Sequence, residues 1–288
     1  MSNSIAITSG KGGVGKTTVA VNLALTLSQM GSKVSLIDAD FGLANAHILL
    51  GINPKKTIRD VLKNNMSIED VIDMGPHGLK FISGGNGLID ILNIEKNSKY
   101  QLIRSLDPIQ KQTDTLIVDI PAGASENSMT FASAVDRLVI ILVSEPTSFM
   151  DAYTFIKTAN LDYNLHNFSI VVNMAENEKA AKETFLKFQN IVCKFLDASL
   201  TFAGGIPRTK KIQNAIIKKL PVVLNKEAEL EKLAKRIPSK VADRPDCPPH
   251  ILEKLSKSKD WSVANRVATN PNAPQSALDR IGKTENFR

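Results

Sequence analysis

The sequence predicts an α/β fold in which helices cover both faces of a doubly wound, mostly parallel sheet. Three observations predict it. First, the chain begins with an apolar stretch, a glycine-rich loop and a helical segment. Second, further short apolar stretches end in polar side chains. Third, helical segments separate these apolar stretches. The 288 residues, 43% of them hydrophobic, can form one good-sized domain with some remainder. We place this domain at residues 1–239 and a small all-α repeat region at residues 240–288.

The first element is the glycine-rich loop at residues 8–18, TSGKGGVGKTT, between an expected strand at 4–8 and an expected helix at 19–30. Its glycines and the closing Lys16-Thr17 pair fit the pattern of a phosphate-binding loop. Such a loop aims backbone N–H groups at one point, where the dipole of the helix also favours an anion. Lys16 should reach the β- and γ-phosphates of a nucleotide, and Thr17 should ligate Mg²⁺. The expected nucleotide-binding residues of the loop are Gly10, Lys11, Gly12, Gly13, Val14, Gly15, Lys16, Thr17 and Thr18.

Carboxylates follow two of the expected strands. Residues 33–37 run into Asp38-Ala-Asp40, and the strand at 115–119 ends in Asp119. The carboxyl ends of parallel strands form the ligand-binding edge of such a sheet, so these side chains should lie beside the phosphate loop. We expect Asp38 and Asp40 to flank Mg²⁺ and the γ-phosphate, one ordering metal-bound water and the other the attacking water; the alternative is that they only cap the next turn. Asp119 fits a Walker B carboxylate, which makes Thr17, Asp38 and Asp119 the expected metal residues.

The middle of the chain is predicted to alternate between helices and strands. We expect two short helices at 57–64 and 67–74, a strand at 79–83 and a plain loop at 84–87. A turn at 121–123 should sense the γ-phosphate and lead into a switch helix at 125–134. Strands are expected at 137–143 and 168–173, and helices at 176–196, 211–220 and 227–237.

Three stretches resemble a known family. Lys11, directly after the first glycine in KGGVGKTT, is typical of the MinD/ParA class of ATPases. Residues 36–51 and 145–153 resemble the FlhG/FleN/YlxH group, which sets flagellar number and placement. The resemblance implies bound ATP and Mg²⁺, slow hydrolysis, and an ATP-dependent homodimer in which Lys11 touches the partner's nucleotide. The alternative for Lys11 is a solvated surface lysine.

The resemblance also implies roles for individual residues. Lys11, Lys16, Asp38 and Asp40 would be the catalytic residues. Asn173 would hydrogen-bond adenine, and a turn made by Ile206 and Pro207 would line the adenine pocket; capping of the following helix is the alternative for Asn173. His47 stands where the group usually has an acidic residue, and we interpret it as a surface or supporting residue rather than a catalyst.

The composition limits the class of protein. Cys193 and Cys247 have no spacing typical of a disulfide framework or a zinc site, and they argue against an iron–sulfur carrier of the same class. No apolar run approaches the ~20 residues that cross a bilayer. We therefore expect a cytoplasmic protein, with peripheral positions at the membrane, a cell pole or the nucleoid as alternatives. The net charge of +7 favours acidic partners.

A basic cluster surrounds the helix expected at 211–220. It is either a solvated helix face or a contact surface for non-specific DNA or anionic lipid. The cluster comprises Arg208, Lys210, Lys211, Lys218 and Lys219.

An internal repeat occupies the end of the chain, where residues 240–255 match residues 266–281 at an offset of 26. A period in this range indicates stacked helical units, here resembling variant leucine-rich or HEAT-like repeats. Two such units are few for an independent stack. We therefore expect their apolar residues to pack on the ATPase domain and their outer face to bind a protein partner; a disordered tail is the alternative. The apolar residues are Ile251, Leu252, Leu255, Val263, Val267, Leu278 and Ile281.

Three functions remain open from sequence. The first is a dimerising switch ATPase that places or counts flagella or another polar assembly. The second is a ParA-like positioning ATPase carried on the nucleoid by the basic cluster. The third is a partner-binding scaffold whose ATPase has decayed, against which the intact set of charged site residues counts. That set is Lys11, Lys16, Asp38, Asp40 and Asp119.

Overall fold

The computed structural model describes residues 3–41, 45–64, 66–85, 102–224, 249–257 and 261–282, with positions 242, 245 and 247. The side chains of Lys211, Trp261 and Ser262 lie outside this description. So do the helix expected at 227–237, residues 86–87 of the expected loop, and the expected domain boundary at 239/240.

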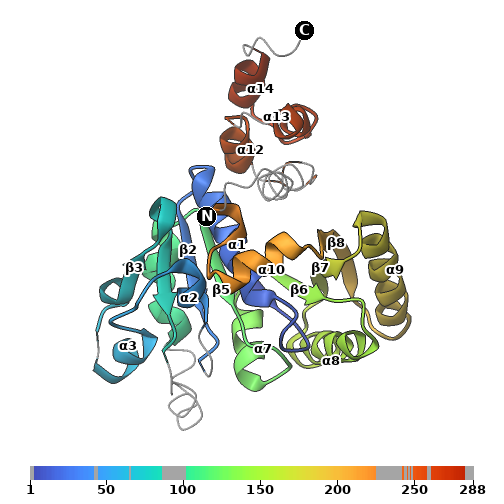
Figure 1. The fold of residues 1–288 in the computed structure, drawn as a ribbon, viewed down its shortest axis with the longest axis horizontal. Helices are drawn as coiled ribbons and strands as arrows, with labels where there is room; N and C mark the ends of the chain where they lie inside the picture. The colour runs from blue at the N-terminus through green and yellow to red at the C-terminus, as the bar shows by residue number, and fades with distance from the viewer. Residues whose placement is uncertain are drawn as a thin grey trace.

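An eight-stranded sheet runs through the molecule in the order β3-β4-β2-β5-β1-β6-β7-β8 (Figure 1). Every pairing is parallel except that of β3 with β4. The predicted doubly wound, mostly parallel sheet is therefore confirmed. The strands are β1 Asn3–Thr8, β2 Val34–Asp38, β3 Ile72–Met74, β4 Lys80–Ser83, β5 Thr115–Asp119, β6 Arg137–Leu142, β7 Asn167–Ala175 and β8 Ser199–Pro207.

Helices cover both faces of the sheet because alternate strand residues face opposite sides. In β1, Ile7 packs with α1 and α2 on one face, while Ala6 belongs to the core beneath α3, α6, α7, α8 and α9 on the other. The helices are α1 Lys16–Gln29, α2 Ala46–Leu50, α3 Ile58–Asn64, α6 Asp107–Gln112, α7 Glu126–Ser133, α8 Pro146–Tyr163, α9 Glu178–Phe195, α10 Lys210–Ile217, α12 Pro249–Leu255, α13 Trp261–Ala268 and α14 Gln275–Gly282. None of the described helices is long and apolar enough to cross a membrane.

Two local predictions are wrong. Residues 67–74 do not form a helix: Ser67 caps the short 3-10 turn η1 Ile68–Val71, and Ile72–Met74 then pairs antiparallel with β4 at the sheet edge. Ile206 and Pro207 do not form a separate turn either, because they are the last residues of the long strand β8. In both places pairing with a neighbouring strand overrides the local turn and helix signals.

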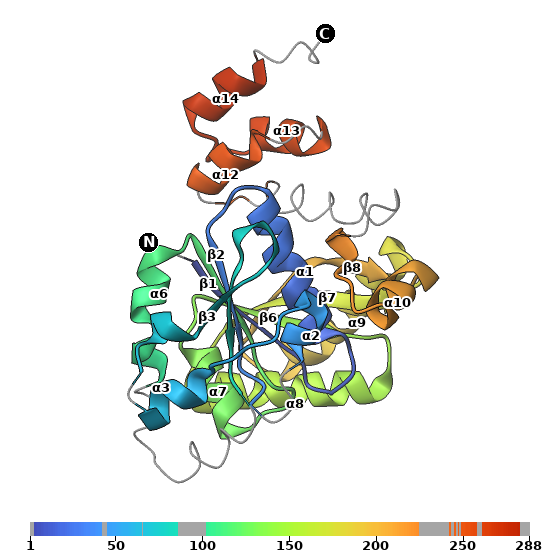
Figure 2. The same ribbon diagram turned by 60° about the vertical axis from the view of Figure 1, so that its left-hand side comes forward.

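The C-terminal helices α12, α13 and α14 form their own apolar cluster, which includes Ile251, Leu252, Leu255, Val263 and Val267. Residues of α12 and of α14 stand 26 positions apart, as the sequence repeat does. The cluster lies beyond the N-terminal ends of the strands, away from α7 and α8 (Figure 2). From the rest of the chain, Met30 packs against it, and Lys254 pairs with Asp114 just before β5.

This arrangement corrects one expectation and supports another. The apolar residues of the tail were expected to bury against the ATPase domain, but they bury chiefly against one another, and Leu278 is only half-buried. Each of the helices α12, α13 and α14 contacts the other two, which lets the two repeats bury their apolar residues against one another. The cluster nevertheless contacts the first part of the chain, as expected, through Met30 and through the ion pair of Lys254 with Asp114.

Candidate functional site

The glycine-rich loop joins β1 to α1 and has the backbone that a phosphate cradle requires. Gly13 and Gly15 have φ values of +80° and +88°, which side chains with a Cβ rarely adopt. At Gly10 the need is steric, because an added Cβ would lie 2.1 Å from the carbonyl carbon of Asp151 in α8. The loop is therefore held between α1 and the first turns of α8, with its N–H groups at the start of α1.

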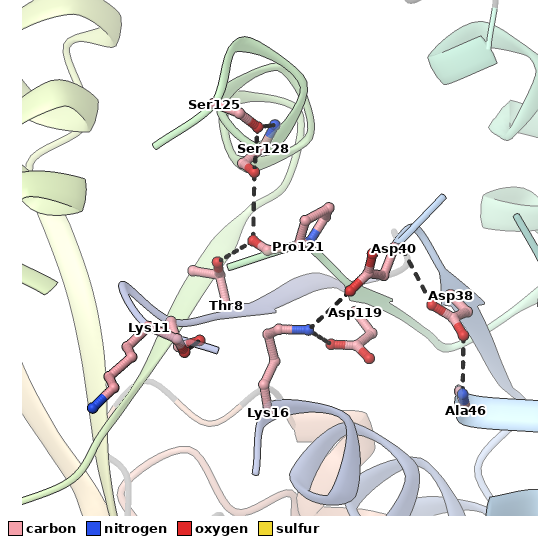
Figure 3. A network of polar contacts seen from close by, with 11 residues as sticks. Thr8, Lys11, Lys16, Asp38, Asp40, Ala46, Asp119, Pro121, Ser125 and Ser128 are labelled. Carbon is pink, nitrogen blue, oxygen red and sulfur yellow. Dashed lines mark hydrogen bonds and ion pairs between the residues drawn. The ribbon is translucent and has the colours of Figure 1, made fainter. Parts of the chain in front are cut away.

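Lys16 is buried at the first position of α1 and points across the carboxyl ends of the strands (Figure 3). Its Nζ lies 3.2 Å from Oδ1 of Asp119 and 4.0 Å from Oδ2 of Asp40. The predicted lysine and two of the predicted carboxylates thus converge on one point. These carboxylates neutralise the buried ammonium group of Lys16.

The sheet register places Asp38 and Asp119 side by side, because β2 and β5 are parallel neighbours in which these residues are paired. Asp38 is fully buried, and its oxygens accept hydrogen bonds from the backbone N–H groups of Asp40 (3.2 Å) and Ala46 (3.0 Å). Burial, with a smaller contribution from the charge of Asp119, raises the pKa of Asp38 from 3.8 to about 7. Asp38 therefore does cap the turn that follows, while it also lies at the site.

Asp119 has an oxygen atom that remains available. Burial raises the pKa of its carboxyl group, against the opposing effects of Lys16 and of a hydrogen bond from Thr17. Its Oδ2 atom is buried and has no hydrogen-bond partner among the described residues. An unpaired carboxylate oxygen next to the Thr17 hydroxyl is the hard-oxygen environment that Mg²⁺ prefers. The residues present therefore fit a magnesium ion.

The turn after β5 is tied to the phosphate loop. Gly123 donates its N–H to the carbonyl of Ser9 at 2.9 Å. The carbonyl of Pro121 accepts hydrogen bonds from Thr8 Oγ1 at 3.1 Å and from Ser128 Oγ at 3.4 Å (Figure 3). Ser128 belongs to α7, so the turn connects the loop that would hold a nucleotide to the predicted switch helix.

Lys11 points away from the carboxylates (Figure 3). Its Nζ lies 3.2 Å from Oε2 of Glu145 and 3.1 Å from Oγ1 of Thr147, at the start of α8. The side chains of this ion pair are 41% exposed at Lys11 and 58% exposed at Glu145. Lys11 is thus neither a free surface lysine nor a part of the buried charge network. The sequence had drawn attention to the 145–153 segment only for its family resemblance, and its contact with Lys11 was missed.

Asn173 does not cap a helix, because α9 is capped by Asn177. Its Nδ2 instead donates to the carbonyl of Val14 at 2.7 Å, and a Cβ on Gly15 would lie 2.4 Å from the same atom. The capping alternative is therefore wrong, and the side chain braces the phosphate loop. Asn173 lies in β7 at the irregularity between the Val172–Gly205 and Ala175–Pro207 pairs, which puts it near Ile206 and Pro207, both half-buried at the end of β8.

His47 lies in α2, directly after the residue whose N–H binds Asp38. It is half-buried, its Nδ1 has no hydrogen-bond partner in the described chain, and burial lowers its pKa. A neutral, half-buried imidazole agrees with a supporting rather than a catalytic position.

Comparisons with known proteins agree with this geometry. A sequence profile of the ParA family, described as NUBPL iron-transfer P-loop NTPase, matches residues 1–242. The chain is 37% identical over 218 residues to the antiactivator FleN of Pseudomonas aeruginosa, covering 76% of this chain and 78% of that protein. It is 34% identical over 225 residues to the flagellum site-determining protein YlxH of Helicobacter pylori, covering 74% of this chain and 72% of that protein.

A solved structure also matches. The cell division protein MinD of Aquifex aeolicus superposes with a TM-score of 0.67 at 25% identity, over 82% of this chain and 97% of that one. The residues that the family profile matches include the phosphate loop, the three aspartates and all eight strands of the sheet. With the family profile covering most of the chain, the conclusion is that this chain belongs to the ParA/MinD family of P-loop ATPases.

Proposed function

We propose that this chain is an ATP-driven switch that positions or counts a cellular structure, most directly flagella or another polar assembly. The observation that carries the proposal is the convergence of Lys16, Asp119 and Asp40 at the phosphate loop, together with an accessible Lys11 outside it. The flagellum is suggested as the positioned structure by the name of one similar protein, the flagellum site-determining protein YlxH, while the other is named antiactivator FleN.

The chemistry follows from the positions of the side chains. The N–H groups of the loop and Lys16 would bind the phosphates of ATP, and Lys16 would leave its carboxylate partners for them. Thr17, Asp38 and Asp119 would hold Mg²⁺, which neutralises charge on the β- and γ-phosphates. Asp40 lies at the mouth of the site and is less buried than Asp38 and Asp119, which suits a carboxylate that orients the attacking water.

The switch itself would be a homodimer closed by ATP. Lys11 sits on an exposed surface and its ion pair with Glu145 is worth at most about 1 kcal/mol, so it can be released to reach the nucleotide of a second copy. Hydrolysis would remove the phosphate that attracts it, and the link from Gly123 to Ser9 would carry the change to α7.

We also propose that the chain divides into an ATPase domain at 1–239 and a helical repeat appendage at 240–288 that binds a protein partner. Two observations support the division: the family profile ends at residue 242, and α12, α13 and α14 have a core of their own. The predicted cytoplasmic location and its peripheral alternatives remain part of this proposal.

A second candidate is a ParA-like ATPase carried on the nucleoid, and the basic residues around α10 favour it. A gel shift with non-specific duplex DNA, with and without ATP and at several salt concentrations, distinguishes the two candidates. Binding that needs ATP and weakens steeply with salt supports the nucleoid candidate. Flagellar counts in cells carrying Lys16→Ala test the first candidate, since they should change when the switch cannot bind ATP.

The biochemical test uses three variants of the full chain. Lys16→Ala should abolish ATP binding, since the charge facing the phosphates is lost. Asp40→Ala should bind ATP but hydrolyse it about 100-fold more slowly. In the Asp40→Ala background, light scattering should show an ATP-dependent dimer that Lys11→Ala abolishes. Wild-type turnover by Asp40→Ala, or ATP-insensitive monomers throughout, would contradict the proposed switch.

A further inference from the structure

The surface around α10 exposes more apolar area than the helix needs for its own packing. Ala215 is buried and Ile212 packs beside it, so the inner side of the helix is already satisfied. On the outside, Ile217 is 77% exposed, Leu220 46% and Ile216 39%. Single exposed apolar residues are normal on proteins, but here three lie within five positions, at the end of α10 and in the turn that follows it.

Uniform positive charge surrounds this patch. Residues 208–220 contain five basic residues and no acidic one. Arg208, Lys210, Lys218 and Lys219 are exposed, and none forms an ion pair with another residue of the described chain. Figure 1 shows α10 lying across the front of the molecule, clear of α9 and of the C-terminal helices.

The combination of exposed apolar side chains with uncompensated positive charge distinguishes α10 from the exposed Phe195 at the end of α9. Phe195 on α9 is 65% exposed, but the Lys194 ammonium group lies 5.5 Å from its ring centre, and α9 carries glutamates as well as lysines. Residues 208–220, in contrast, contain no acidic residue that could offset the charge of the lysines. A partner that fits it must therefore be anionic and must accept apolar side chains.

We propose that residues 208–220 bind the surface of an anionic phospholipid bilayer. Ile216, Ile217 and Leu220 enter the boundary between headgroups and acyl chains, and the lysines contact lipid phosphates. A duplex nucleic acid would contact the same basic residues but would leave the three apolar side chains in water. It therefore accounts for the positive charge of this surface but not for its exposed apolar residues. The contact does not depend on ATP hydrolysis, and it adds a membrane surface to the proposed function rather than restating it.

The electrostatic and the apolar contributions to membrane affinity each have an expected magnitude. One lysine near an anionic membrane strengthens binding about fivefold. Removing the apolar surface of Ile217 from the interface weakens binding about tenfold. Because a vesicle without anionic lipid removes the contribution of every basic residue at once, binding to it should fall to near zero.

The test is sedimentation of the full chain with vesicles of phosphatidylglycerol and phosphatidylcholine, without nucleotide and at low salt. We expect binding that falls about tenfold for Ile217→Ser, about fivefold for Lys218→Gln, and to near zero on vesicles of phosphatidylcholine alone. Phe195→Ser is the matched control, because Phe195 is also a largely exposed apolar residue but lies on α9, and this variant should bind as the wild type does. All three substitutions are on the surface, and thermal melting checks that each variant folds.

Three results would overturn the proposal. Undiminished binding by Ile217→Ser together with Lys218→Gln would place the contact elsewhere, as would an equal loss in Phe195→Ser. Binding to duplex DNA in a gel shift, without binding to anionic vesicles, would identify a nucleic-acid surface instead. ATP turnover is measured on the same samples, so a failure of the proposed ATPase is seen separately from a failure to bind lipid.

Discussion

The free energy of unfolding of nucleotide-free Asp38→Asn, taken relative to that of the wild type, should rise as the pH rises. Burial raises the pKa of Asp38 to about 7, whereas the unfolded chain has a value near 3.8. Between these values the folded protein keeps a proton that the unfolded chain has lost, so the wild type loses stability as the pH rises. Each pH unit changes the free energy of unfolding by about 1.4 kcal/mol.

The pH-dependent change in stability can be separated from the pH-independent loss that the substitution itself causes. The amide of asparagine can accept only one of the two backbone N–H groups, those of Asp40 and Ala46, so the variant loses about 1–3 kcal/mol at every pH. The pH-dependent part is free of this cost. Between pH 5 and pH 8 the stability of Asp38→Asn relative to the wild type should therefore rise by about 3 kcal/mol.

The assay is urea unfolding at pH 5, 6, 7 and 8 in EDTA, without nucleotide, because a bound cation would itself stabilise the ionised carboxylate. Asp162→Asn, which replaces an exposed aspartate on α8, is the control for the same substitution outside the buried site. A constant difference between Asp38→Asn and the wild type over this range would refute the reasoning. It would mean that Asp38 is not buried as a carboxyl group beside Asp119.

Three further predictions concern other contacts. Glu145→Gln frees Lys11 from an exposed ion pair and should tighten the ATP-dependent dimer by at most about fivefold in light scattering; a weaker dimer would show that Glu145 itself contributes to the interface. Asn173→Ala should weaken ATP and GTP alike by about tenfold in calorimetry, because it leaves the buried carbonyl of Val14 unpaired, whereas a loss confined to ATP would indicate an adenine contact. Lys254→Ala should lower the melting temperature by about 2–4 °C without changing ATP turnover, since it removes only the pair with Asp114; a slower turnover would show that the tail acts on the site.

Much of the site could be predicted from residue types and spacing. The glycines and Lys16 define a phosphate loop because no other local arrangement needs that pattern between a strand and a helix. The proximity of Asp38 and Asp119 could be predicted because parallel strands end at one edge of the sheet. The register of β2 with β5, in which the two residues are paired, confirms this prediction. The position of Asp40 near the site could be predicted for the same reason, because it lies two residues beyond Asp38.

Side-chain direction and edge-strand pairing could not be predicted in this way. Residues 72–74 have the composition of a short helix, but β4 offers them unpaired backbone groups at the sheet edge, and they form β3. Asn173 could equally well cap a helix or face the nucleotide. Asn173 donates to the Val14 carbonyl because β7 lies close to the phosphate loop, and Val14 is 159 positions away in sequence.

The sequence alone therefore determined the chemistry: a phosphate loop, its cation and the carboxylates that accompany it, on a parallel sheet. These features depend on short-range spacing and on the fixed polarity of parallel strands, which a linear pattern records. Only the tertiary structure decided the partner of Lys11, the bracing contact of Asn173, the self-contained core of the C-terminal helices and the exposure of Ile217. Each of these depends on which distant segments come within contact distance, and that distance is set by the packing of the whole chain.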